Sequence, residues 1–278
     1  MAIDGLRRFM DDIIEPEFIA HGDGFIPKEK MLDWLTRLSE FGLVNAPHAA
    51  KHGGLDMGWI THGLLWEEVA FSSLDIALPI LINASVADML IHIASDPIRE
   101  RYLPDLMTGR SIACMGISEP DVGSDVSAVK TRAVRDGEDY IINGEKTWIS
   151  NGQHSDFIIC TCATPKGLTH ILIDREEHGY EVAGIPKIAL NGQSTAQVFL
   201  TDVRVPATNV IGGVGQALRQ TLILFERARC HMGLWGISVG RRALHEAIRY
   251  SQERTQHGKA IAEHQLIAAK ISTMATEL

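Results

Sequence analysis

Apolar residues recur every three or four positions along the first 112 residues, the spacing that places them on one face of a helix. In residues 28–43, this face contains Met31, Leu32, Leu35 and Leu38. The pattern predicts an amphipathic helix whose apolar face packs against its neighbours.

Three further helices are predicted in the same part of the chain. In residues 62–73, the expected inner face is formed by Leu64, Leu65, Val69 and Ala70. Residues 73–94 are apolar on nearly all sides, which predicts a helix buried between other helices. No apolar run was expected to approach membrane-spanning length. Asp96 and Pro97 begin another helix, because proline is favoured in a first turn.

The pattern changes near Ser111 to short runs of β-forming residues separated by turn residues. Residues 128–150 predict two strands joined by a turn at 135–138, and Asn143 with Gly144 marks a further turn or bulge. Similar runs continue to Val205 and Pro206. These features predict an antiparallel β domain.

A long helical pattern follows from Gly213 to Glu253, interrupted by Gly233, Gly236 and Gly240. We expect close packing at these glycines, since each costs about 1 kcal/mol relative to alanine in an exposed helix. The apolar face of this helix is predicted to contain Leu218, Leu222, Phe225, Met232, Val239, Leu244 and Ile248. Another helix begins in residues 262–278, and the sequence stops inside its pattern.

The fold class is therefore predicted to be α+β with three parts. An N-terminal α-helical domain spans residues 1–112, and a middle antiparallel β domain spans residues 113–212. A C-terminal helical bundle begins at residue 213 and is expected to be incomplete at residue 278, as in a truncated chain.

Composition and charge narrow the possible functions. The 278 residues carry a net charge of −9, which argues against nucleic acid as the main partner because phosphate binding requires a basic surface. The four cysteines and twelve histidines match no metal-ligand spacing, so no metal is expected. No signal-peptide core is present at the N-terminus, which predicts a cytoplasmic location, or the mitochondrial matrix in a eukaryote.

Two sequence blocks carry the strongest chemical signal. Residues 114–125 read CMGISEPDVGSD, and residues 142–152 read INGEKTWISNG. Both resemble signatures of the acyl-CoA dehydrogenase family. The resemblance continues collinearly through residues 202–206 and 253–265, and several blocks in one order are more specific than any single motif. It implies the family's helix–β–helix fold and FAD as cofactor.

The resemblance assigns Met115, Ile117, Ser118, Trp148 and Ser150 to flavin binding. Chemistry supports this assignment, because a flavin ring needs hydrogen-bond donors along one edge and a flat apolar surface to lie on. Two residues apart on one strand, the tryptophan and the second serine are expected to share a face. Alone, the tryptophan would more often be a core residue.

Substrate contacts are implied for Ser124, Phe225, Glu226 and Arg229. The serine is expected near the thioester-bearing arm of coenzyme A, although capping a turn is an equal alternative. The glutamate and the arginine are helical neighbours, so they form either a polar clamp on coenzyme A or a surface ion pair.

Arg254, His257 and Gln265 match positions that reach the flavin's pyrophosphate and adenosine from a second subunit. The resemblance therefore implies a homodimer or homotetramer.

The implied reaction is the α,β-dehydrogenation of an acyl-CoA, with electron transfer flavoprotein as the electron acceptor. No catalytic base is assigned within the chain. Alanine stands at 228, where some family members have the base, and Glu119 is interpreted as structural. The alternatives are a flavin oxidase or monooxygenase acting on a small molecule, and an inactive short subunit.

Overall fold

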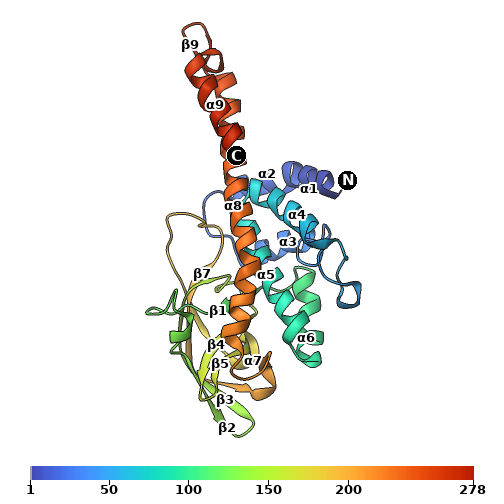
Figure 1. Cartoon of the computed structure of the whole chain (residues 1–278), viewed down its shortest axis with the longest axis vertical. Coiled ribbons are helices and arrows are strands. Elements are labelled where there is room, and N and C mark those ends of the chain that lie inside the picture. Colours follow the sequence, from blue (N-terminus) through green and yellow to red (C-terminus); the bar gives the residue numbers. More distant parts are fainter. Residues whose placement is uncertain (1) are drawn as a thin grey trace.

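The computed structural model describes residues 2–278. It contains a helical N-terminal part, a mixed β-sheet and a long helix that runs beside both (Figure 1). The N-terminal helices are α1 (Ala2–Phe9), α2 (Glu15–His21), α3 (Lys28–Ser39), α4 (Gly58–Ser72), α5 (Leu74–Ile93) and α6 (Asp96–Met107). A π-helical segment, Met10–Ile14, joins α1 to α2 without a break.

The predicted helix faces are mostly those that the fold buries. In α3, Met31, Leu35 and Leu38 are buried. In α4, Leu65 is buried, whereas Leu64 lies on the exposed side, so its assignment to the inner face is wrong. The apolar stripe of α4 is wider than the surface that neighbouring helices cover, so the residue at its edge, Leu64, remains exposed.

Helix α5 crosses the centre of the helical part. Within the described residues it is the one helix long and apolar enough to cross a membrane, so the expectation that no apolar run reaches that length is wrong. However, 72% of its apolar window is buried inside the protein. Its apolar surface therefore serves the core, as the all-round pattern predicted.

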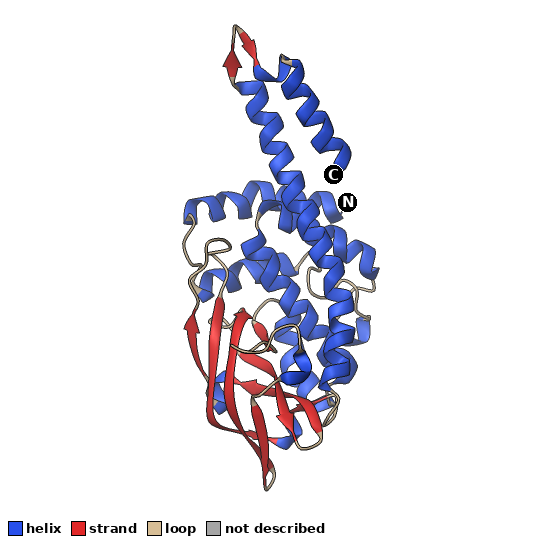
Figure 2. Cartoon of the chain, turned by 60° about the vertical axis from the view of Figure 1, so that its left-hand side comes forward, coloured by secondary structure: helices blue, strands red, loops and turns tan. Residues whose placement is uncertain are grey.

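The sheet lies against one end of the helical part (Figure 2). Its strands are β1 (Ala113–Gly116), β2 (Arg132–Asp136), β3 (Asp139–Ser150), β4 (Phe157–Thr164), β5 (Gly167–Asp174), β6 (Glu181–Gly184), β7 (Thr195–Pro206) and β8 (Val210–Ile211). The order along the sheet is β6-β7-β3-β2-β4-β5-β8, with β1 paired to β4 off this path. A short helix, α7 (Arg175–His178), follows β5.

Most strand pairs are antiparallel, as expected, but β1 runs parallel to β4. This pairing joins segments separated by a whole hairpin, which local sequence patterns do not reveal. The predicted bulge at Asn143 is present, because the pairing of β3 with β7 shifts register between Ile142 and Gly144.

Helix α8 (Ala217–Glu253) is the longest element, and its buried face differs from the predicted one. The buried residues are Ala217, Thr221, Leu224, His231, Ser238 and Ser251. The predicted apolar face lies one residue further along the chain, about 100° around the helix. Its residues Leu218, Leu222, Met232 and Val239 are exposed. The face of α8 that packs against the core consists largely of small and polar residues, and no other part of the described chain covers its apolar face.

The C-terminal part of the chain projects away from the rest as an arm (Figure 1), which we define as residues 247–278. The arm consists of the end of α8, a hairpin of β9 (Thr255–Gln256) and β10 (Lys259–Ala260), and α9 (Gln265–Glu277). Leu278 packs back on Gly240, where a larger side chain would require the leucine to shift. Gly233 and Gly236 face open space, so the close packing expected there is not made by this chain.

Candidate active site

A groove opens between α5 and α8 on one side and the ends of β1 and β3 on the other. Its volume is about 560 Å³. Most of its lining is apolar, and the lining residues include Leu81, Met115, Ile117, Ser118, Trp148, Ser150, Leu224, Phe225, Ala228, Arg229 and Met232. The structure thus brings the five predicted flavin-binding residues together with two of the predicted substrate residues.

A buried ion pair holds the segment that follows β1. The Glu119 carboxylate accepts hydrogen bonds from Lys146 Nζ at 2.8 Å and from the backbone amides of Lys130 and Thr131 at 2.7 and 2.9 Å. Lys146 is fully buried and also donates to the carbonyl of Ile117 at 3.2 Å. With its acceptors occupied in this way, Glu119 is a structural residue.

Burial raises the pKa of Glu119, but the hydrogen bonds from Lys146 and Thr131 outweigh it and leave the pKa below its usual value. The carboxylate is therefore charged at neutral pH and fixes the loop by charge-assisted bonds. Because Lys146 lies on β3 and Glu119 follows β1, this pair ties together the two segments that carry Ser118 and Trp148 on one wall of the groove.

Trp148 has an unusual backbone conformation that turns its ring into the groove. Its φ is 59°, in the left-handed region, and the register of β3 with β7 shifts between Lys146 and Ile149. The strict strand alternation that predicted a shared face with Ser150 is therefore broken here, although both residues line the groove. The tryptophan side chain is 62% exposed, so its ring is not part of the core.

The segment at Ser118 presents polar groups to the same wall. Its hydroxyl donates to the carbonyl of Thr147 at 2.8 Å, and the Thr147 amide donates to the Ser118 carbonyl at 3.0 Å. Within residues 2–278, the amide N–H of Ser118 has no acceptor. A free donor beside an exposed aromatic ring and apolar Met115 fits the edge and face of a flavin ring.

The opposite wall is formed by α8. Phe225, Ala228 and Arg229 line the groove, whereas Glu226 points away and is exposed. Among the described residues neither Glu226 nor Arg229 forms an ion pair, so the alternative of a pair between them is wrong. Ser124 is exposed in the loop beside Gly123, which lines the groove. Because Arg229 lines the groove without an ion-pair partner, its guanidinium is available to an anionic ligand.

No Asp or Glu side chain from the described residues lines the groove. Within the same residues, no group of three His, Cys, Asp or Glu is placed to hold a metal ion.

The sequence predicts that the apolar residues of 73–86 set the depth of the substrate pocket, and α5 does line the groove, but the sequence does not say which of its side chains face it. Leu78, Leu81, Ile82 and Ser85 line it, and Ser85 also faces a second cavity behind Ala228. The uniform apolarity of this helix gives no periodic signal that would single out one face.

Arg254, His257 and Gln265 lie at the far end of the arm, well away from the groove of the same chain (Figure 1). His257 occupies the β9–β10 turn with a φ of 53°, and Gly258 follows it with a φ of 78°. The three residues are exposed. One chain therefore cannot bring them to its own groove.

Comparisons with known proteins agree along the whole chain. Residues 1–110 match the acyl-CoA dehydrogenase N-terminal domain, residues 114–203 the middle domain and residues 213–278 the C-terminal domain. The cyclohexane-1-carbonyl-CoA dehydrogenase of Syntrophus aciditrophicus (strain SB) is 31% identical, with 99% of this chain and 72% of the relative covered. The glutaryl-CoA dehydrogenase of Desulfococcus multivorans is also 31% identical, with 98% and 72% covered.

Solved structures show the same fold. A glutaryl-CoA dehydrogenase from Mycobacterium smegmatis in complex with FADH2 superposes with a TM-score of 0.91 at 25% identity, covering 99% of this chain and 71% of that one. A glutaryl-coenzyme A dehydrogenase in complex with glutaryl-CoA gives a TM-score of 0.93 at 27% identity, covering 100% and 72%.

Proposed function

Because the chain belongs to the acyl-CoA dehydrogenase family of FAD-dependent oxidoreductases, we propose that its groove binds FAD and an acyl-CoA thioester for α,β-dehydrogenation. The observation that carries this proposal is the pairing of two walls. One wall presents an exposed aromatic ring and a free amide at Trp148 and Ser118, and the other presents Phe225 and an unpaired Arg229.

Each wall has a separate task in this proposal. Trp148 and Met115 provide an apolar surface for the flavin ring, while Ser118 and Ser150 offer polar contacts at its edge. FAD supplies the acceptor for the hydride that leaves the β carbon. Arg229 attracts the phosphates of coenzyme A, for which an unpaired guanidinium is well suited.

The α-proton must be removed by a base within hydrogen-bond reach of the α carbon. Glu119 is excluded, because its carboxylate is already engaged by Lys146 and two amides. Ala228 faces the groove and has no basic group. We therefore propose that the base is a carboxylate outside residues 2–278.

A second copy of the chain would complete the FAD site. Arg254, His257 and Gln265 stand exposed at the end of the arm, where they can reach another chain and not their own groove. The uncovered apolar stripe of α8, which includes Leu218, Leu222 and Val239, offers a surface for that contact. We propose a homodimer or homotetramer on this basis. As the electron acceptor, we propose electron transfer flavoprotein.

Anaerobic titration of the FAD-loaded protein with acyl-CoAs tests the function. Bleaching of the flavin absorbance by an acyl-CoA, followed by recovery on addition of electron transfer flavoprotein, is the expected result. A flavin that no acyl-CoA bleaches, but that oxygen reoxidises rapidly after chemical reduction, would indicate an oxidase or monooxygenase. A protein that takes up no FAD would exclude both activities.

A further inference from the structure

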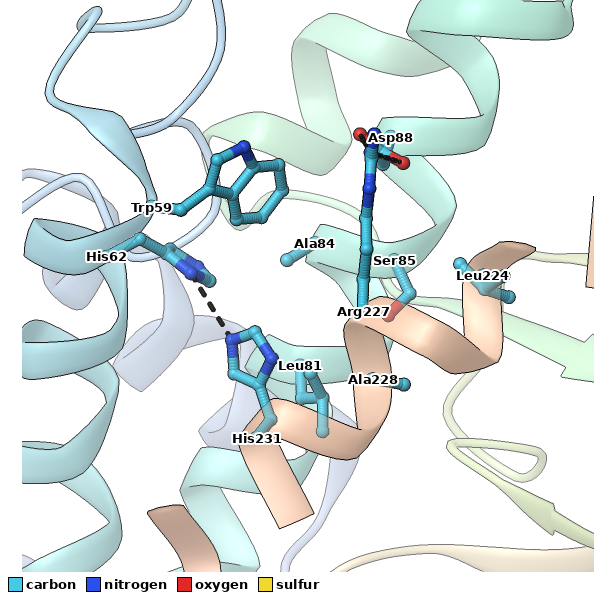
Figure 3. A pocket seen from close by; sticks show the side chains of 10 residues that line it. All are labelled: Trp59, His62, Leu81, Ala84, Ser85, Asp88, Leu224, Arg227, Ala228 and His231. Carbon is cyan, nitrogen blue, oxygen red and sulfur yellow. Dashed lines mark hydrogen bonds and ion pairs between the residues drawn. The ribbon is translucent and has the colours of Figure 1, made fainter. Parts of the chain in front are cut away.

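A second cavity lies behind Ala228, between α4, α5 and α8 (Figure 3). Its volume is about 20 Å³. Four residues line both this cavity and the groove, namely Leu81, Ser85, Leu224 and Ala228. The cavity and the groove are therefore neighbours, and these four residues form the wall between them.

Two buried histidines form the inner wall of this cavity. His62 Nε2 lies 3.0 Å from the carbonyl of Leu43, and His62 Nδ1 lies 3.3 Å from His231 Nε2 (Figure 3). A carbonyl accepts and never donates, so His62 carries its proton on Nε2 and, when neutral, accepts at Nδ1. His231 must then donate from Nε2, which leaves its Nδ1 with a lone pair.

That lone pair is unused. His231 is only 8% exposed, and its Nδ1 has no hydrogen-bond partner of normal geometry among the described residues. Burial lowers the pKa of His231, and this effect outweighs the carbonyl of Arg227, one turn earlier on α8, which raises it. A buried acceptor without a donor is costly, so this position favours a ligand that brings a donor.

The charged side chains that line the cavity, Arg227 and Asp88, are paired with each other. Arg227 Nη1 contacts both carboxylate oxygens of Asp88 at 2.6 and 2.5 Å, and His92 lies 3.3 Å from the same carboxylate. Burial lowers the pKa of His62 to about 4, so both members of the histidine pair are neutral at pH 7. With its one cation already paired, the cavity has no free positive charge for a carboxylate.

The size of the cavity limits what it can hold. A water molecule needs at least about 10–15 Å³ of such space, so the cavity accepts one group of that size. The much larger groove provides the room for the carbon chain that leads to it.

We propose that the histidine pocket, defined by His62, His231, Asp88 and Arg227, binds a neutral hydrogen-bond donor of hydroxyl size at the distal end of the acyl chain. The donor bonds to His231 Nδ1. This inference rests on the proposed function, because it assigns the substrate class of the same groove: a hydroxylated acyl group in place of a purely aliphatic or a dicarboxylic one.

The test compares three series of CoA thioesters on the FAD-loaded protein: alkanoyl, ω-hydroxyalkanoyl and ω-carboxyalkanoyl chains of increasing length. Isothermal titration measures binding, and the flavin spectrum reports occupancy of the groove. At the chain length that reaches the pocket, the hydroxylated ligand should bind about tenfold more tightly than its alkanoyl counterpart. The carboxylated ligand should bind no better than the alkanoyl one.

Two variants assign the preference to His231. His231→Leu removes the acceptor and should abolish the difference between hydroxylated and alkanoyl ligands. His231→Asn keeps an acceptor oxygen close to the Nδ1 position and should retain about threefold preference. His48→Asn is the matched control, because His48 is equally buried but does not line the pocket, and it should leave the ratio unchanged.

The three thioester series, measured on the unaltered protein, test the hydroxyl preference even if a variant does not fold. Equal binding of hydroxylated and alkanoyl ligands at every length would overturn the inference and leave the proposed function intact. A preference that survives in His231→Leu would also overturn it. Failure of every thioester to bind would overturn both.

Discussion

The body of the protein and its arm differ in how far their side chains are buried within the chain. In the body, Glu119 and Lys146 form a buried ion pair that fixes one wall of the groove. In the arm, which the structure describes completely, Ser251 is the one buried residue, and apolar side chains such as Leu266 are exposed. The groove wall in the body is therefore held by contacts within the chain, whereas the side chains of the arm have few such contacts.

In the proposed function, one cofactor site is formed by the groove in the body of one chain and the arm of a second chain. The half in the body is held by packing and by the buried ion pair, so its geometry is set before any ligand binds. The proposed half in the arm would instead depend on how a second chain docks. Four predictions test how separate the two halves are.

Acid should have the largest effect, and it should act on the body. Burial lowers the pKa of His62, His154 and His170 to about 4 each, below the ordinary 6.5. Between pH 6.5 and pH 4, these histidines bind protons in the unfolded chain but not in the folded one. The free energy of unfolding is therefore highest above pH 6.5 and decreases as the pH falls towards 4, by about 3 kcal/mol per histidine. Urea unfolding at several pH values, followed by fluorescence of the buried Trp34 and Trp66, measures this loss.

Glu119→Leu should destabilise the body by about 3–5 kcal/mol, because it leaves Lys146 buried without a partner. The double variant Glu119→Leu/Lys146→Met should recover most of the loss. Lys130→Ala is the control, since its pair with Asp121 is exposed and contributes less than about 1 kcal/mol. Urea unfolding at pH 7 compares the three. A single variant as stable as the control would show that the pair does not hold the groove wall.

Arg254→Ala should weaken FAD binding about 10–100-fold by removing one charge-assisted contact from the second chain. The free energy of unfolding should not change, because the side chain is exposed and unpaired within its own chain. Flavin fluorescence titration measures the affinity. Mixing this variant with Trp148→Ala should restore about a quarter of the sites, since each mixed dimer contains one intact pair of halves. No restoration would mean that the arm and the groove do not share a site.

Trp148→Ala should weaken FAD binding about tenfold through loss of ring stacking, the smallest of the four effects. Trp148→Gly should lose the same affinity yet raise stability by up to about 1 kcal/mol, because glycine adopts the left-handed backbone without strain. Thermal unfolding and flavin titration of the two variants separate these effects. A large loss of stability in either one would show that the ring supports the core.

The sequence alone was enough for the order of helices and strands, and for the five residues of the groove wall near Ser118 and Trp148. These features depend on local periodicity, on turn residues and on a motif whose members lie close together in the chain. It also indicated that no carboxylate base would stand at Ala228.

The tertiary structure decided which face of each helix is inside. Helix α8 buries Thr221 and His231 and exposes Leu222, because burial depends on what packs against a helix and not on which side is most apolar. The same holds for the histidine pocket: His62 and His231 are 169 positions apart, and only the packing of α4 on α8 brings their rings together. Contacts between distant segments are set by the assembled core, so they leave no periodic trace in the sequence.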